Sequence, residues 1–228
     1  MERVFDKELK ELKEKLLYMG GIVEKMIGLA IRGLIERNKE LSQEIFKHEK
    51  EINMLHIEVD ELCIKLIALH QPIAVDLRFI TSAMKINNEL ERMGDQSVNI
   101  SENTEIYLRY PQVKPLIDTP RIAEIASQMV KDSLTSFIKE DVELARRVLE
   151  RDDEVDGLKD QIFRELLTYM LSDPKTIQPA LALIFICRNI ERIADHATNI
   201  SEDVIFMALG KDIRHHSEER GKSIVYSP

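Results

Sequence analysis

The sequence is poor in aromatic residues and in residues that break helices. Aromatic side chains make up 5% of the 228 residues, tryptophan is absent, and there are only 8 glycines and 7 prolines. Sheets favour aromatic side chains and need frequent turns, whereas the abundant leucine, glutamate and lysine favour helices. The composition therefore argues against an all-β fold and predicts an all-α protein.

Long apolar segments and cysteine clusters are also missing. The longest apolar run, residues 180–187, is far shorter than the roughly 20 residues of a membrane span, and residues 1–15 are charged rather than apolar. Cys63 and Cys187 lie in apolar surroundings, which is typical of reduced core thiols. The net charge of −9 disfavours binding to nucleic acid or to anionic membranes. We therefore expect a soluble cytoplasmic protein without a nucleic-acid partner.

Apolar residues recur at helical spacing along most of the chain. Between Leu9 and Leu34 they fall alternately three and four residues apart, which predicts a long amphipathic helix. Its glycines, at 20, 21 and 28, suggest close helix packing, with a kink in the helix as the alternative. Thr119 is expected to cap a helix that opens with Pro120. Further helices are predicted at about 41–69, 75–108, 141–171 and 176–209, with the fourth helix starting near 121.

The chain contains an internal duplication. "NKELSQEIFKHEKEINML" (38–55) aligns with "DVELARRVLERDDEVDGL" (141–158) at an offset of 103 residues, and a second pair of segments aligns at an offset of 100. This indicates six long helices arranged as two pseudo-repeated antiparallel three-helix bundles. The expected parts are a first bundle at 1–110, a proline-rich linker at 111–120, a second bundle at 121–210 and a polar tail at 211–228.

Acids and amides are repeated on the third helix of each half. The segments read "NNELERMGDQSVNISEN" (87–103) and "CRNIERIADHATNISED" (187–203). At about 100° per residue, their polar side chains form one stripe along the helix. The small residues Gly94 and Ala194 would leave the backbone open to a ligand. The stripes consist of Glu91, Asp95, Asn99 and Glu102 in the first half, and Glu191, Asp195, Asn199 and Glu202 in the second.

The preceding helix of each half supplies matching side chains. Residues equidistant from a hairpin turn lie at the same height. The first-half pairs centre on Pro72, and the second-half pairs centre within "SDP" (172–174), so both centres coincide with expected turns. The pairs are Asn53 with Glu91, Glu49 with Asp95, Asp156 with Glu191, and Asp152 with Asp195.

Two layers of carboxylates and amides predict cation sites. Oxygen ligands suit iron, manganese, magnesium, calcium, or zinc with added water. The alternative is a set of solvated acids paired with Arg92, Arg188 and Arg192. The duplication favours metal, because like charges one turn apart repel each other. His56 and Asp60 continue the stripe of the second helix, and His56 is expected at the surface rather than as a ligand.

Catalytic motifs are absent from the sequence. No Glu-x-x-His motif, glycine-rich phosphate loop or cysteine–histidine zinc pattern occurs, and the repeated serines, Ser101 and Ser201, have no adjacent histidine. We therefore expect a protein that is not an enzyme. A carboxylate-bridged metalloenzyme and a metal-storage bundle remain as alternatives.

"ERMGD" (91–95) and "ERIAD" (191–195) resemble the paired signatures of the PhoU family of phosphate transport accessory proteins. "MGGIVEKM", "QPIAVDLR", "TYMLSDPKTI" and "KDIRHH" agree, so the resemblance extends over residues 5–216. It implies multinuclear metal clusters on two three-helix bundles, with iron as the first expectation and zinc, manganese or magnesium as alternatives. The family's acidic motif falls on 49–53, 91–95, 152–156 and 191–195. Asn53 departs from it, so the first cluster is expected to carry one charge fewer.

The resemblance also implies a regulatory function. PhoU proteins restrain the high-affinity phosphate transporter and keep the phosphate-starvation histidine kinase inactive when phosphate is plentiful. The expected partners are thus the transporter's ATPase subunit and the phosphate-sensing kinase. The expected assembly is a homodimer, located in the cytoplasm and peripheral to the inner membrane face through its partners.

Overall fold

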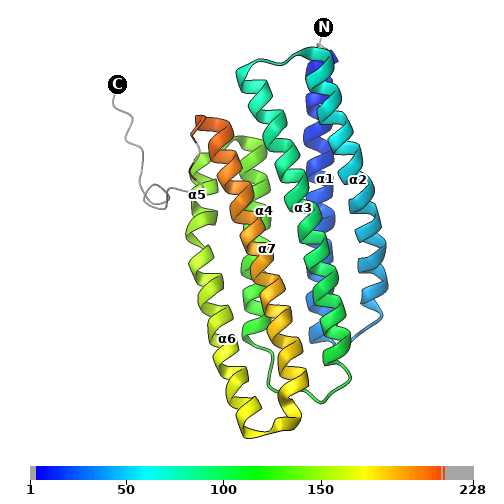
Figure 1. Cartoon of the computed structure of the whole chain (residues 1–228), viewed down its shortest axis with the longest axis vertical. Helices are drawn as coiled ribbons and strands as arrows, with labels where there is room; N and C mark the ends of the chain where they lie inside the picture. The colour runs from blue at the N-terminus through cyan, green and yellow to red at the C-terminus, as the bar shows by residue number, and fades with distance from the viewer. Residues whose placement is uncertain (1–3, 212, 214–228) are drawn as a thin grey trace, which may run out of the picture.

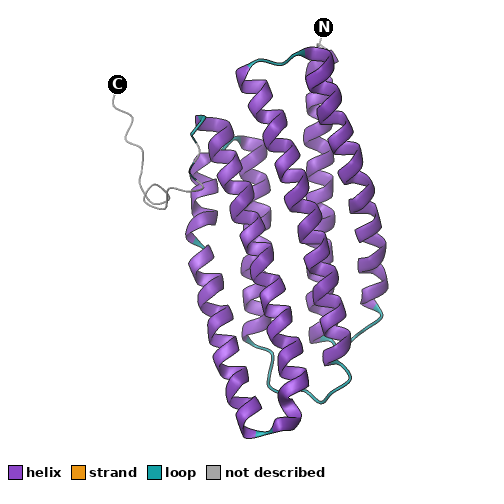
Figure 2. Cartoon of the chain, viewed as in Figure 1, coloured by secondary structure: helices purple, strands orange, loops and turns teal. Residues whose placement is uncertain are grey.

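The computed structural model describes residues 4–211 and 213, and its elements are helices (Figures 1 and 2). The expected all-α fold is confirmed. The tail expected at 211–228 lies outside the described residues except for Lys211 and Ile213. The first half contains α1 (Val4–Ile35), α2 (Leu41–His70) and α3 (Ala74–Tyr107); the second contains α4 (Asp118–Lys139), α5 (Val142–Glu150), α6 (Asp152–Ser172), the 3-10 turn Pro174–Thr176 and α7 (Ile177–Leu209).

The helix expected at 141–171 is interrupted once. The backbone N–H of Arg151 donates to the carbonyl of Val148, so a tighter turn separates α5 from α6. The two helices still follow one another along a single rod (Figure 1), so the described residues form six helical rods. Asp141 caps this rod, because its side chain accepts a hydrogen bond from the Leu144 N–H at 2.9 Å.

The connection between the halves differs in detail from the expectation. α3 ends at Tyr107 and α4 begins at Asp118, so the connection covers residues 108–117. Thr119 is not a helix cap. It is buried inside the first turn of α4, with its Oγ1 3.8 Å from the Cys187 Sγ on α7. The chain therefore enters α4 earlier than the Thr-Pro pair suggested.

The halves pack side by side through α3 against α7 and α1 against α4 (Figure 1). A Cβ added at Gly20 would lie 2.2 Å from Leu134 Cδ1. The expectation of close packing is thus correct at Gly20, where α1 approaches α4. It is wrong at Gly21 and Gly28, where an added Cβ would meet nothing within 4 Å.

Apolar side chains fill the interior of both halves. Cys63 and Cys187 are free and buried within it, as expected. Gly94 is also buried, and a Cβ there would lie 3.1 Å from Ile52 Cδ1, so its small size lets α2 approach α3 and does not open the backbone to a ligand. Among residues 4–211, every helix is too short or too polar to cross a bilayer.

Candidate functional site

The first acid cluster comprises Glu49, Asn53, Glu91 and Asp95, on α2 and α3. The Asn53 Nδ2 donates to Glu49 Oε1 at 2.7 Å. Burial raises the pKa of Glu91, and the nearby charges of Asp95 and Glu49 raise it further. Burial and the charge of Glu49 likewise raise the pKa of Asp95. The expected hairpin register therefore places these acids within electrostatic reach of one another.

His56 borders the first acid cluster from α2. Its Nε2 lies 3.7 Å from Asp60 Oδ2. The positive charge that the His56 ring carries when protonated opposes the rise in the Glu91 pKa. The Nδ1 of His56 is buried and has no hydrogen-bond partner among the described residues. His56 is thus half-buried rather than a simple surface residue.

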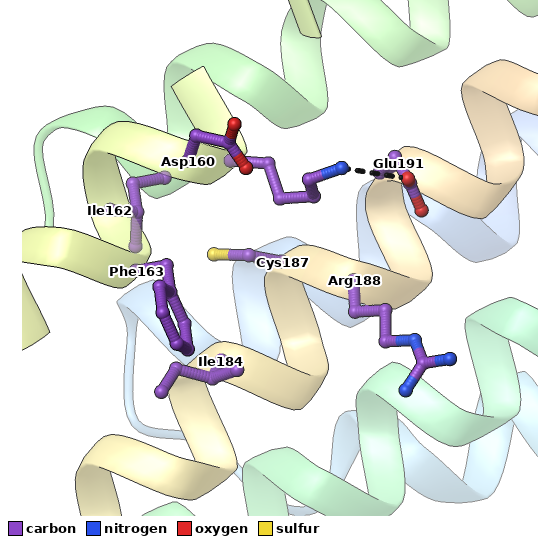
Figure 3. Close-up of a pocket in the computed structure, with 8 residues that line it drawn as sticks. Asp160, Ile162, Phe163, Ile184, Cys187, Arg188 and Glu191 are labelled. Atoms are coloured by element: carbon purple, nitrogen blue, oxygen red, sulfur yellow. Dashed lines mark hydrogen bonds and ion pairs between the residues drawn. The ribbon is translucent and has the colours of Figure 1, made fainter. Parts of the chain in front are cut away.

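The second acid cluster comprises Asp152, Asp156, Glu191 and Asp195, on α6 and α7. Lys159 lies within it, and its Nζ donates to Asp156 Oδ1 at 2.7 Å and to Glu191 Oε1 at 2.9 Å. Figure 3 shows the bond that reaches Glu191 across the two helices. These bonds, the one to Asp156 first, raise the pKa of Lys159 although partial burial opposes the rise.

The pKa of Asp195, in the second acid cluster, is strongly raised. Burial, followed by the charges of Glu191, Asp152 and Asp156, raises the pKa of Asp195 to about 6. Three neighbouring acids therefore face this carboxylate, whereas burial and a single acid account for the rise at Asp95. At neutral pH the cluster favours any cation that enters it.

The residues in the C-terminal part of each predicted stripe make contacts of their own. Asn199 donates to Glu89 Oε2 at 3.0 Å, on the face between α3 and α7. Glu202 is only 5% exposed. Asn99 accepts a hydrogen bond at its backbone carbonyl from Asn103. Glu102 is exposed. Asn199 also lines a pocket together with Asp195, so this part of the second stripe borders the second acid cluster.

A polar contact between the halves centres on two residues that the sequence did not predict for the site, Glu89 and His196. The Glu89 carboxylate on α3 lies 2.7 Å from His196 Nδ1 and 3.6 Å from Arg92 Nη1. Although burial opposes it, hydrogen bonds from His196 and Asn199 hold the pKa of Glu89 below its usual value. Only the packing of α3 on α7 brings Glu89 and His196 together, so the sequence carried no local signal for this contact.

Arg92 does not form an ion pair with Glu91, although its nearby charge opposes the rise in the Glu91 pKa. Arg92 pairs with Glu89, outside the first acid cluster. Arg188 extends away from Glu191 in Figure 3. Among the described residues, no lysine or arginine forms an ion pair with Glu91 or Asp95. The first acid cluster thus lacks the kind of internal cation that Lys159 provides in the second.

A pocket of about 300 Å³ lies between α6 and α7, beside the second acid cluster. Phe163, Ile184 and Cys187 form its apolar wall, and Lys159 and Glu191 its polar rim (Figure 3). Burial raises the pKa of the Cys187 thiol to about 12. Cys187 therefore remains protonated and is a poor nucleophile.

The donor sets fit a divalent cation, although the side chains are not drawn together around one. In the described part of the chain, no three histidine, cysteine or acidic side chains are gathered closely enough to hold a metal as they stand. Two observations support the fit. The buried Nδ1 of His56, a residue whose charge acts on Glu91, is without a partner among the described residues, and the Lys159 ammonium is a stand-in cation between Asp156 and Glu191.

Comparison with known proteins identifies the family of the chain. A family model described as the PhoU domain matches twice, at residues 16–104 and 119–204, and so covers both halves. The chain belongs to the PhoU family. The matched ranges contain both acid clusters, which places the duplication seen in the sequence on the two PhoU domains.

Curated PhoU relatives and solved PhoU structures match nearly the whole chain. The phosphate-specific transport system accessory protein PhoU homologue of Aquifex aeolicus is 42% identical, over 95% of this chain and 98% of the relative. The Zymomonas mobilis homologue is 40% identical, over 99% and 94%. The crystal structure of PhoU from Pseudomonas aeruginosa has a TM-score of 0.88 at 35% identity, covering 91% of this chain and all of that one.

Proposed function

We propose that this protein is a regulatory adaptor of phosphate uptake. It restrains the high-affinity phosphate transporter and the phosphate-starvation response when phosphate is plentiful. The observation that carries the proposal is the match of both halves to the PhoU domain, together with relatives named as accessory proteins of the phosphate-specific transport system over nearly their whole length. An accessory role acts through protein contacts rather than through turnover of a substrate.

The described side chains support a function other than catalysis. The Ser201 hydroxyl donates to the Ala197 carbonyl of its own helix at 3.0 Å and is buried. Cys187 is buried with a raised pKa. Neither residue has the neighbouring base that activates a nucleophile. Regulation by binding therefore agrees better with the site than covalent catalysis does.

The acid clusters are proposed to hold the metal of this adaptor. Glu49, Asn53, Glu91 and Asp95 would be the ligands in the first half, and Asp152, Asp156, Glu191 and Asp195 in the second. Iron is the first candidate, with zinc, manganese or magnesium as alternatives. When bound, the cation supplies positive charge that offsets the repulsion among these carboxylates. Because the ligands come from both arms of a hairpin, they would fix α2 against α3 and α6 against α7.

The proposed partners are the ATPase subunit of the phosphate transporter and the phosphate-sensing histidine kinase. The adaptor would work as a homodimer in the cytoplasm and reach the inner face of the membrane through these partners. Such a position gives one protein access to both the transporter and the kinase.

Co-purification from the native host tests the adaptor function. The tagged full chain is expected to retain the transporter ATPase subunit and the kinase, and to retain more of them at high than at low phosphate. The ATPase subunit of an unrelated transporter serves as the control. Deletion of the gene is expected to raise phosphate uptake under plentiful phosphate. Absence of both partners at either phosphate level, with unchanged uptake after deletion, would contradict the proposal.

A further inference from the structure

A polar groove lies between α3 and α7, the last helices of the two halves, which pack side by side (Figure 1). One cavity in it has a volume of about 400 Å³ and is lined by Arg92, Gln96, Arg192, Asp195, His196 and Asn199. A neighbouring cavity of about 370 Å³ shares Arg92 and Asn199 with the first. The two cavities therefore form one continuous groove, and the side chains that line it are polar or charged.

The internal repeat brings two equivalent arginines to the same level of this groove. Glu89 on α3 contacts His196 on α7, and the two helices run in opposite directions (Figure 1). Three residues further along α3, Arg92 therefore lies opposite residue 193, beside Arg192. The offset of 100 residues makes Arg92 and Arg192 equivalent positions of the two halves. The groove thus collects one guanidinium group from each half in one cavity.

The polar groups of this cavity have unused hydrogen-bonding capacity. Among the described residues, Arg192 forms no ion pair or hydrogen bond, and Arg92 forms one ion pair, with Glu89 at 3.6 Å. The Gln96 Oε1 is buried and has no hydrogen-bond partner in that part of the chain. The two guanidinium groups carry like charges at one level of the groove, so a bound anion would offset their repulsion.

The groove contains acceptors as well as donors, which limits the anions that fit it. The Asp195 carboxylate lines the same cavity as both arginines, and it accepts no hydrogen bond from the described residues. Sulfate has no proton, so it would be repelled by this carboxylate. Hydrogen phosphate can instead donate its P–OH proton to a carboxylate, while its other oxygens accept from guanidinium groups in paired hydrogen bonds.

We propose that the groove between α3 and α7 is a binding site for inorganic phosphate, in which Arg92 and Arg192 bind the phosphate oxygens and Asp195 accepts a hydrogen bond from the P–OH group. Because the two arginines come from different halves, the ligand joins the halves at this point. The regulatory meaning of the site rests on the proposed function, in which the protein responds to plentiful phosphate. Phosphate binding itself needs neither a partner protein nor a metal.

Isothermal titration calorimetry of the chelator-treated full chain with inorganic phosphate at pH 7.5 tests the site. The wild type is expected to bind one phosphate per chain. Arg92→Gln and Arg192→Gln should each weaken binding by about tenfold, because each removes charge-assisted hydrogen bonds to the ligand. The double variant should show no detectable binding. Arg164→Gln is the matched control, because Arg164 is exposed on α6 and lines neither cavity of the groove, and it should bind phosphate within twofold of the wild type.

Two other ligands test the role of the P–OH group. Sulfate has no proton to donate, and phosphoserine is mostly a dianion without a P–OH group at this pH. Both should bind at least about tenfold more weakly than phosphate. Asp195→Asn should narrow the difference between phosphate and sulfate by about tenfold, because it removes the carboxylate that repels sulfate.

Several outcomes would overturn the inference. The wild type binding no phosphate, or the double arginine variant binding it within twofold of the wild type, would exclude the site. Equal affinity for phosphate and sulfate would exclude the role of Asp195, and equal affinity for phosphate and phosphoserine would assign the groove to a phosphorylated partner rather than to free phosphate. Circular dichroism without ligand verifies the helices of each variant. A purely structural role of the arginines would change the unfolding midpoint and leave phosphate binding unaltered.

Co-purification from the host separates failure of the site from failure of the adaptor function. The double arginine variant is expected to retain the transporter ATPase subunit and the kinase equally at high and low phosphate. If the wild type retains these partners but binds no phosphate, the adaptor function stands and the phosphate site fails. If it binds phosphate through the two arginines but retains no partner, the site stands and the adaptor function fails.

Discussion

The α2–α3 and α6–α7 hairpins place acids at the same height but limit the repulsion among them by different means. In the first hairpin, Asn53 replaces one acid and donates a hydrogen bond to Glu49. In the second, all four acids are present and Lys159 bridges Asp156 to Glu191. The difference shows that the duplicated backbone register persists while the chemistry at each cluster diverges. Two clusters at matching positions therefore differ in their charges and hydrogen bonds.

The two halves that carry the clusters also pack against each other through α1 and α4, and Gly20 tests that contact with the largest expected effect. Because an added Cβ would lie 2.2 Å from Leu134 Cδ1, Gly20→Leu should overpack the contact between α1 and α4. We expect a loss of about 2 kcal/mol in the free energy of unfolding. Urea denaturation followed by circular dichroism measures it.

Gly21→Leu is the matched control for this change. It adds the same side chain to the next residue of α1, where an added Cβ meets nothing within 4 Å. Relief from glycine's poor helix propensity should make the control neutral or stabilising by up to about 1 kcal/mol. Equal losses in the two variants would show that the α1–α4 approach does not determine how the halves are held.

The second prediction separates the clusters by their pH dependence in the absence of metal. The folded pKa of Asp195 is raised to about 6 from 3.8, so its ionised form is penalised in the folded state. This penalty is present above about pH 6, shrinks as the pH falls and is absent below about pH 4. Asp195→Asn should therefore raise the free energy of unfolding by about 1 kcal/mol at pH 8, after allowance for solvent screening, and have little effect at pH 4.

Asp95→Asn provides the first-half comparison. It should act in the same direction with a smaller amplitude, because burial and only one acid, Glu49, raise the pKa of Asp95. Chelator-treated protein unfolded in urea at several pH values gives both curves. A larger benefit from Asp95→Asn, or a benefit from Asp195→Asn that persists at pH 4, would contradict the proposed electrostatic difference.

The fold and the hairpin register were predictable from sequence because both follow from local patterns. Helical spacing, the prolines near 72 and 174, and the repeat offset determine which residues lie at one height. The split at Arg151 was missed because it depends on a single tighter backbone turn. Gly94 was misinterpreted because only the packing of α2 on α3 reveals that its missing side chain accommodates Ile52.

The contacts within the candidate site were less predictable, because they depend on how the helices are rotated. The spacing of Asp156 and Lys159 allowed an ion pair on one helix, but the second bond, to Glu191, requires α6 and α7 to face each other at that point. The contact between Glu89 and His196 joins residues from different halves. No periodic pattern in either half could indicate it.

The smallest expected effect comes from giving the first acid cluster the acid that it lacks. Asn53→Asp removes the hydrogen bond to Glu49 and adds a like charge one turn away, without a lysine to offset it. We expect a loss of about 0.5 kcal/mol in the metal-free protein at pH 7.5, measured by urea unfolding. Adding His56→Lys recreates the acid–lysine spacing of Asp156 and Lys159, and should recover most of that loss. If the double variant is no more stable than Asn53→Asp alone, the lysine does not couple to the added acid. The difference between the clusters would then lie in the rotation of their helices rather than in this pair of side chains.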